Sequence, residues 1–164
     1  MKTQKKRKLE RKTDYRKRLG LLKSEKPRLI FRKTNKYILS QYVTSEEAKD
    51  RIIFGITSKE LLRFGWPKEF GGSLKSISAS YLIGYLTGKK IKEKKLEKPI
   101  LDLGMYRTIE KSRAFAFIKG LIDAEIKIQC KEDKLPNEDV IKGKNLKKDF
   151  SEYFKKVKLK IDGK

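Results

Sequence analysis

The sequence predicts an α/β protein with a mixed sheet, in which an antiparallel meander is packed against helices, and with basic N- and C-terminal extensions. Three segments rich in β-branched and aromatic residues follow one another within residues 28–57. Two later segments, 73–90 and 113–126, have apolar residues at helical spacing and enclose a short apolar segment at 99–104. A meander followed by helix, strand and helix is typical of a mixed sheet with helices packed on it.

The N-terminal part is predicted to be a polar arm over residues 1–8 and one helix over residues 9–23, which has a thin apolar stripe on a strongly basic surface. Pro27 ends this helix, because the residue before a proline is disfavoured in the α region. The first two strands are predicted at 28–33 and 37–43, with a turn between them.

The later elements are predicted from apolar spacing and from the positions of proline and glycine. Ser112 is expected to cap the last long helix, and Gly84 and Gly88 are expected to let the helix before it pack closely on a strand. Residues 127–145 are expected to form a loop. In order, the other elements are a strand at 51–57, a short helix at 58–64, a helix at 73–90, a strand at 99–104, a helix at 113–126 and a short helix near 146–154.

The charge of the chain is concentrated outside the segments with apolar patterns. The 164 residues include 44 Lys and Arg against 21 Asp and Glu, which leaves a formal net charge of +23. Residues 1–36 contain 16 basic and 3 acidic residues, and the segments 89–98 and 142–164 are also strongly basic, whereas 37–88 and 99–141 are nearly neutral. This distribution predicts a neutral folded body with cationic arms that follow the phosphates of a nucleic acid.

The composition argues against several classes of protein. A single cysteine leaves no internal disulfide, and without histidine no Cys/His zinc site or histidine-based catalytic triad can form. No run approaches the ~18 apolar residues of a membrane span, and the basic N-terminus lacks the apolar segment of a secretory signal. We therefore expect an intracellular, soluble protein that uses no cofactor and binds neither a membrane nor a small-molecule substrate.

Signatures of enzymes are also scarce, and the sequence predicts a protein that is not an enzyme. The glycines at 71–72 are not followed by the residues of a phosphate-binding P-loop. Asp50, Asp102 and Asp123 lie near the ends of predicted elements and leave a metal-dependent nuclease open as an alternative. Asp102 equally fits a strand-end turn and Asp123 a charge on a helix surface, while Trp66 is expected in the core.

Several motifs follow one another between residues 7 and 126. They are DYRKRL at 14–19, LLKS at 21–24, KPRL at 26–29, RKTNKYI at 32–38, GW at 65–66, ASYLIGYLTGKK at 79–90, LDLG at 101–104, SRAFA at 112–116 and KGLIDA at 119–124. This series closely resembles the large-subunit ribosomal protein L-eighteen family, the 5S-rRNA-binding protein, in its archaeal and eukaryotic branch. The resemblance implies an α/β domain that binds 5S rRNA and anchors it to 23S-type rRNA in the cytoplasmic ribosome, beside ribosomal proteins that include protein L-five.

Three positions depart from the family's pattern. Lys111 and Glu125 stand where glycine is expected on either side of the last long helix, and Gln129-Cys130 replaces an expected Pro-His pair. The departures leave the N-terminal motifs intact. The chain is accordingly expected to comprise a basic N-terminal arm with a helix at 1–26, an α/β RNA-binding domain at 27–127, and a loop with a basic C-terminal extension at 128–164.

The candidate RNA-binding residues are mostly cationic, because Lys and Arg neutralise phosphates. Arg28, Arg32 and Lys36 alternate along the first hairpin, so one sheet face or its rim is expected to be cationic. Asn35 can donate to and accept from a base or sugar, and Tyr15 can stack on a base. The full set is Arg7, Lys8, Arg11, Lys12, Tyr15, Arg16, Lys17, Arg18, Lys23, Arg28, Arg32, Lys33, Asn35, Lys36, Lys89, Lys90, Ser112 and Arg113. The alternative function is a general RNA-binding or RNA-chaperone module without a preference for 5S rRNA.

Overall fold

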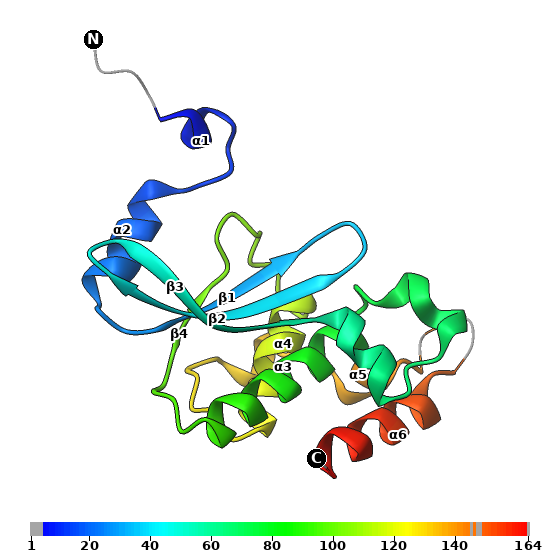
Figure 1. The fold of residues 1–164 in the computed structure, drawn as a ribbon. Helices are drawn as coiled ribbons and strands as arrows, with labels where there is room; N and C mark the ends of the chain where they lie inside the picture. The colour runs from blue at the N-terminus through cyan, green and yellow to red at the C-terminus, as the bar shows by residue number, and fades with distance from the viewer. Residues whose placement is uncertain (1–4, 145, 147–148, 164) are drawn as a thin grey trace.

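The computed structural model describes residues 5–144, 146 and 149–163, and it contains one mixed four-stranded sheet with the strand order β3-β2-β1-β4 (Figure 1). Strand β1 (Arg28–Lys33) pairs antiparallel with β2 (Ile38–Glu46) and parallel with β4 (Ile100–Asp102), and β2 pairs antiparallel with β3 (Lys49–Thr57). The predicted α/β class, with its mixed sheet and antiparallel meander, is confirmed.

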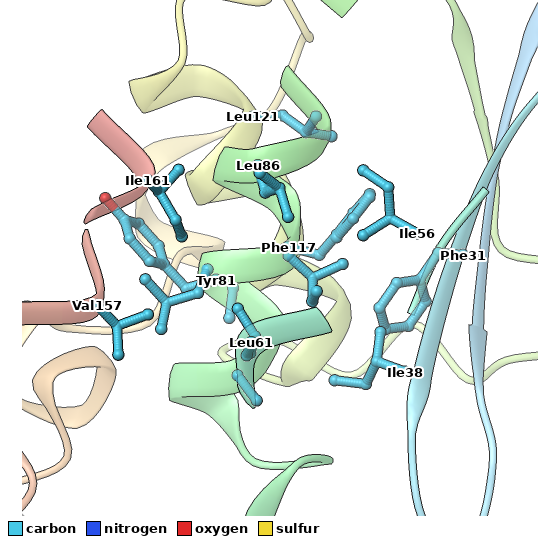
Figure 2. Packing of buried hydrophobic residues seen from close by; sticks show 14 of the residues in the cluster. Phe31, Ile38, Ile56, Leu61, Tyr81, Leu86, Phe117, Leu121, Val157 and Ile161 are labelled. Atoms are coloured by element: carbon cyan, nitrogen blue, oxygen red, sulfur yellow. The ribbon is translucent and has the colours of Figure 1, made fainter. Parts of the chain in front are cut away.

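The core lies between this sheet and two helices, α3 (Ile77–Glu93) and α4 (Arg113–Asp123). Figure 2 shows Phe31, Ile38 and Ile56 projecting from the strands toward Phe117 of α4. These four side chains are fully buried. Alternation along the strands sends every second residue to this face, which is why the apolar side chains of β1 and β2 meet the helices.

Helices α3 and α4 approach each other through glycines. A Cβ built on Gly84 would overlap the backbone carbonyl of Phe117, and one built on Gly88 would overlap the side chain of Ala124. On α4, a Cβ at Gly120 would overlap the carbonyl of Tyr81. The prediction that Gly84 and Gly88 allow close packing is therefore right, but their partner is a helix and not a strand.

A residue with a left-handed backbone conformation lies just outside each end of α4. Lys111 has φ 54° and Glu125 has φ 64°. The backbone N–H groups of Glu125 and Ile126 donate to the carbonyls of Ile122 and Leu121, which is the Schellman pattern that usually has glycine at the left-handed residue. The helix ends at Asp123 and not at 126, and Ser112 occupies its N-cap position without a side-chain capping hydrogen bond.

The N-terminal segment forms two helices where one was predicted over 9–23. These are α1 (Lys6–Leu9) and α2 (Tyr15–Lys23), separated by a left-handed residue at Arg11 (φ 50°). The side chain of Asp14 caps α2 by accepting hydrogen bonds from the N–H groups of Arg16 and Lys17 at 3.0 and 3.1 Å. The prediction missed this break because Asp14 was placed inside the helix and not at its N-cap.

The segments between the strands and the C-terminus contain short helices. Trp66 is buried, as expected, and its ring packs 4.5 Å from that of Phe150. The predicted loop at 127–145 contains two of these helices, and position 145 lies outside the described residues. The helices are η1 (Ser58–Phe64), η2 (Lys68–Ser73), η3 (Glu132–Lys134) and α5 (Glu138–Lys142).

The last helix, α6 (Ser151–Asp162), packs against the side of α3 that faces away from the sheet (Figure 2). It buries Phe154, Val157 and Ile161 in the same core cluster as the strands. The helix predicted near 146–154 falls partly on positions 147–148, outside the described residues, and the helix that is present extends eight residues further along the chain. Its Lys residues alternate with core residues, which is why composition alone suggested a basic end.

Candidate nucleic-acid interface

Arg28 forms the centre of a buried ion network on the face of the sheet opposite α3 and α4. Its side chain is 2% exposed. One guanidinium nitrogen, Nη2, donates to Asp50 at 2.6 Å and to the hydroxyl of Ser45 at 2.9 Å, and Nη1 donates to Asp102 at 3.3 Å. A buried arginine is stable only when such partners compensate the loss of water.

The network continues on both sides of Arg28. Asp50 also accepts from Arg18 of helix α2 at 2.9 Å, and Asp102 accepts from Arg32 of β1 at 3.3 Å. The alternating series Arg18, Asp50, Arg28, Asp102 and Arg32 is hereafter the charge chain. It links helix α2 of the N-terminal arm to three strands of the sheet.

The pKa of Asp50 is lowered by the charge chain. Partial burial acts to raise this pKa, but hydrogen bonds from Ser45, Arg18 and Arg28 outweigh burial and stabilise the ionised form. The carboxylate of Asp50 is therefore ionised at neutral pH, and it holds a cation of the arm and a cation of the sheet at the same time.

A cleft of about 500 Å³ is lined by residues of the N-terminal arm, of β1 and of the loop that follows β4. Its lining combines basic side chains of the arm and of β1 with apolar residues of the loop. The cleft therefore combines positive charge with apolar surface, which suits a nucleotide better than a purely polar ion. Its lining residues include Arg7, Lys12, Lys17, Arg18, Arg32, Leu103, Gly104, Met105 and Tyr106.

The structure brings five of the candidate RNA-binding residues together at this cleft. Arg7, Lys12, Lys17, Arg18 and Arg32 line the cleft. Within the described part of the chain, several others are exposed and make no ion pair with an acidic side chain. They are Lys8, Arg11, Arg16, Lys23, Lys33 and Lys36, while Asn35 is exposed at the tip of the β1–β2 hairpin and Tyr15 carries Lys5 above its ring at 4.6 Å.

Other candidates are used within the protein or lie elsewhere. Arg28 is enclosed by its ion pairs, Lys89 pairs with Asp162 at 2.6 Å, and Lys90 pairs with Glu60 at 3.4 Å. At the start of α4, the Oγ atom of Ser112 and the Nε atom of Arg113 are buried, and neither has a hydrogen-bond partner among the described residues. The expected cationic sheet face is thus largely neutralised at Arg28 by acidic partners.

The residues that sequence reasoning missed are the acidic and small partners of the cleft. Asp50 was considered only as a metal ligand, Asp102 as a metal ligand or a residue of a strand-end turn, and Gly104 was not considered as a site residue. Gly104 has φ 56°, and its N–H donates to Asp102 at 2.8 Å. The Asp-Leu-Gly sequence was the available signal, because an aspartate two residues before a glycine favours such a turn.

The carboxylates of the nuclease alternative are occupied by cationic or hydroxyl donors. Asp123 accepts from Tyr81 at 2.7 Å and pairs with Lys119 at 3.1 Å. Asp50 and Asp102 belong to the charge chain. Over residues 5–144, 146 and 149–163, no group of three or more His, Cys, Asp or Glu could hold a metal ion. In the same part of the chain, every helix is too short or too polar to cross a membrane.

Acidification is expected to release α2 from the sheet. The pKa of Asp50 lies below its unfolded value of ~3.9, so its ion pairs stabilise the folded form above that value and are lost as the pH falls through the lowered pKa. Backbone ¹⁵N relaxation of α2 should show faster local motion as the pH drops below ~4. In an Asp50→Asn variant, α2 should be equally mobile at pH 7. Unchanged relaxation of α2 in both experiments would contradict this role for Asp50.

The fold and the interface together define a class of protein. The α/β body carries an exposed basic arm and a cleft lined by basic side chains. Such an arrangement is typical of proteins that bind nucleic acids through phosphate contacts.

The chain belongs to the family described as ribosomal large subunit proteins 60S L5 and 50S L18, whose pattern matches residues 1–97. It is 42% identical over 140 residues to the large ribosomal subunit protein uL18 of Korarchaeum cryptofilum, a match that covers 85% of this chain and 70% of that protein. It is 36% identical over 137 residues to the uL18 protein of Aeropyrum pernix, covering 83% of this chain and 62% of that protein.

Proposed function

We propose that this protein is a structural constituent of the large ribosomal subunit in the cytoplasm, where it binds 5S rRNA and anchors it to the large-subunit rRNA. The observation that carries the proposal is the gathering of arm and sheet cations at one end of a body that belongs to a ribosomal protein family. Ribosomal neighbours, among them protein L-five, complete the set of proposed partners.

The exposed cations of the arm and hairpin are assigned to the RNA backbone. Arg16, Lys17 and Lys33 are exposed and make no ion pair with an acidic side chain of the described chain, so their charge is available to phosphates. Arg28 is given a different role. Because it is buried and paired with two aspartates, it holds together the part of the sheet that contacts helix α2 and does not itself reach the RNA.

Charge reversal of the arm and hairpin should weaken binding of 5S rRNA steeply. In an Arg16→Glu/Lys17→Glu/Lys33→Glu variant, we expect an affinity loss of at least ~100-fold and a decrease of about 2 to 3 in the slope of log K against log salt, since each lost phosphate contact removes ~0.9 or less. The measurement is competition binding of labelled 5S rRNA against unlabelled tRNA at two salt concentrations.

The matched control reverses three exposed cations that do not line the cleft, as Arg63→Glu/Lys68→Glu/Lys127→Glu. Both variants change the net charge equally, so an equal loss of affinity would assign binding to total charge and not to the proposed interface. If tRNA displaces 5S rRNA freely from the unaltered protein, the general RNA-binding alternative replaces the 5S-specific proposal.

A further inference from the structure

We propose that the cleft between the N-terminal arm and the β4–α4 loop receives one unpaired nucleotide, whose base stacks on the guanidinium plane of Arg32. This inference rests on the proposed function only in that the ligand is RNA. It does not depend on which RNA is bound.

The guanidinium of Arg32 is held in one orientation by three acceptors. Its Nη1 atom donates to the backbone carbonyls of Phe31 at 2.8 Å and of Asp102 at 2.9 Å, and its Nη2 atom donates to the Asp102 carboxylate at 3.3 Å. A fixed plane loses little conformational entropy when a base stacks on it, so Arg32 is prepared for stacking before any ligand arrives.

One face of this plane is covered by Gly104. A Cβ built on Gly104 would lie 2.8 Å from Cζ, 2.8 Å from Nη2 and 3.0 Å from Nη1 of Arg32. Nearly equal distances to the three atoms mean that Gly104 lies over the face of the guanidinium and not beside its edge. The side chain of Arg32 is nevertheless 40% exposed. Gly104 leaves the opposite face uncovered, and we infer that a planar ligand binds there.

The rest of the cleft supplies surfaces for the other parts of a nucleotide. Its volume of about 500 Å³ lies within the range of ~300–1,000 Å³ typical of small-molecule sites. Met105, which is 51% exposed, and Tyr106 give apolar surface in the cleft. Lys17, which makes no ion pair with an acidic side chain of the described chain, gives a cation for a phosphate. A nucleotide combines the matching groups in one molecule: a planar base for the guanidinium, the edge of that base for the apolar side chains, and a phosphate for the lysine.

The nucleotide has to be unpaired. A base within a double helix is stacked on both faces, so it cannot place a face on a protein side chain without leaving its neighbours. Bases in loops and bulges can be displaced and stacked on aromatic rings or guanidinium planes. The cleft is concave, and a single displaced base can enter it where the convex side of a helix cannot.

The test compares two small probes of equal charge, adenosine 5′-monophosphate and ribose 5-phosphate, titrated into the ¹⁵N-labelled protein. The first probe should bind at least about fivefold more tightly, the lower end of the gain from stacking one base. It should also shift the Arg32 Nε–H signal upfield by the ring current of the base. Equal affinity of the two probes, or shifts that map away from the cleft, would overturn the proposal.

Two variants separate stacking from charge. Arg32→Lys keeps the cation and loses the plane, so it should abolish the difference between the probes, whereas Lys17→Ala should weaken both probes by the same factor. If Arg32→Lys unfolds, Gly104→Ala serves instead, because its Cβ displaces the guanidinium. A difference between the probes that survives loss of the plane contradicts the role of Arg32. Since no 5S rRNA is used, the outcome is independent of the competition experiment above.

Discussion

Replacing Gly84 with alanine is expected to destabilise the fold by about 3 kcal/mol, at the upper end of losses from overpacking. The added Cβ would overlap the backbone carbonyl of Phe117, which cannot rotate away as a side chain would. Helices α3 and α4 would have to move apart along their whole contact, and the core between them and the sheet would loosen. For a chain of this size, the midpoint of thermal unfolding should fall by roughly 10 °C, measured by circular dichroism.

The control is Gly20→Ala in helix α2, where a Cβ meets no atom within 4 Å. This change should leave stability unchanged or raise it slightly, because alanine is a better helix former than glycine by ~1 kcal/mol. If Gly84→Ala and Gly20→Ala behaved alike, the close approach of α3 and α4 would not be a requirement of the fold.

Replacing Arg28 with methionine is expected to cost about 3–5 kcal/mol in the free energy of unfolding at pH 7. Methionine fills much of the same space but leaves two aspartates without their shared buried cation. Urea unfolding provides the measurement. Adding Asp50→Asn and Asp102→Asn to the same chain should recover at least half of the loss, because neutral amides need no counter-charge.

Arg18→Met serves as the comparison within the same charge chain. Arg18 and Asp50 are about one-third exposed, and ion pairs of that kind contribute only ~0–1 kcal/mol. If Arg28→Met were as mild as Arg18→Met, the charge chain would be a set of surface contacts and not a buried support for the arm.

Local patterns in the sequence were sufficient to predict the fold class and most elements. The strand at 28–33 was predicted with its observed bounds, since β-branched and aromatic residues run between a proline and a turn. Helix ends were less predictable. The Asp14 cap and the left-handed residue at Arg11 divide the N-terminal helix, and neither changes the apolar spacing from which that helix was predicted.

The departures from the family's glycines show why residue identity and backbone shape must be considered separately. Lys111 and Glu125 keep the left-handed conformation in which glycine is favoured. At the end of α4, burial of Leu121 and Ile126 and the two Schellman hydrogen bonds stabilise the turn. This stabilisation outweighs the cost of a left-handed conformation at Glu125, so the turn is retained without glycine. The ends of this helix could not be predicted from glycine positions, because the glycines are absent while the turns remain.

The positive charge of the candidate site could be predicted from the sequence, but the ion pairs that its cations form with acidic residues could not. The clustering of cations near the N-terminus is visible in the sequence, and the structure places five of them in the lining of the cleft. That Arg28 is buried could not be predicted, because its partners Asp50 and Asp102 lie 22 and 74 residues away in the chain. The same reason applies to Lys89 and Lys90, whose acidic partners come from a distant helix and from η1.

The way in which helix α2 is attached has a consequence for the rate of association. The helix buries none of its residues fully, and an exposed ion pair between Arg18 and Asp50 ties it to the sheet. Detachment of such a helix costs little free energy, so we expect a minor population with the arm detached even at neutral pH, which grows when Asp50 is protonated or replaced. A mobile cationic segment can bind a polyanion that is still some distance from the folded body. The body then approaches the polyanion while the segment stays bound, which raises the rate of association. If the arm binds RNA as proposed, it would capture RNA at a greater distance from the body, and the charge chain would hold it in a defined position after docking.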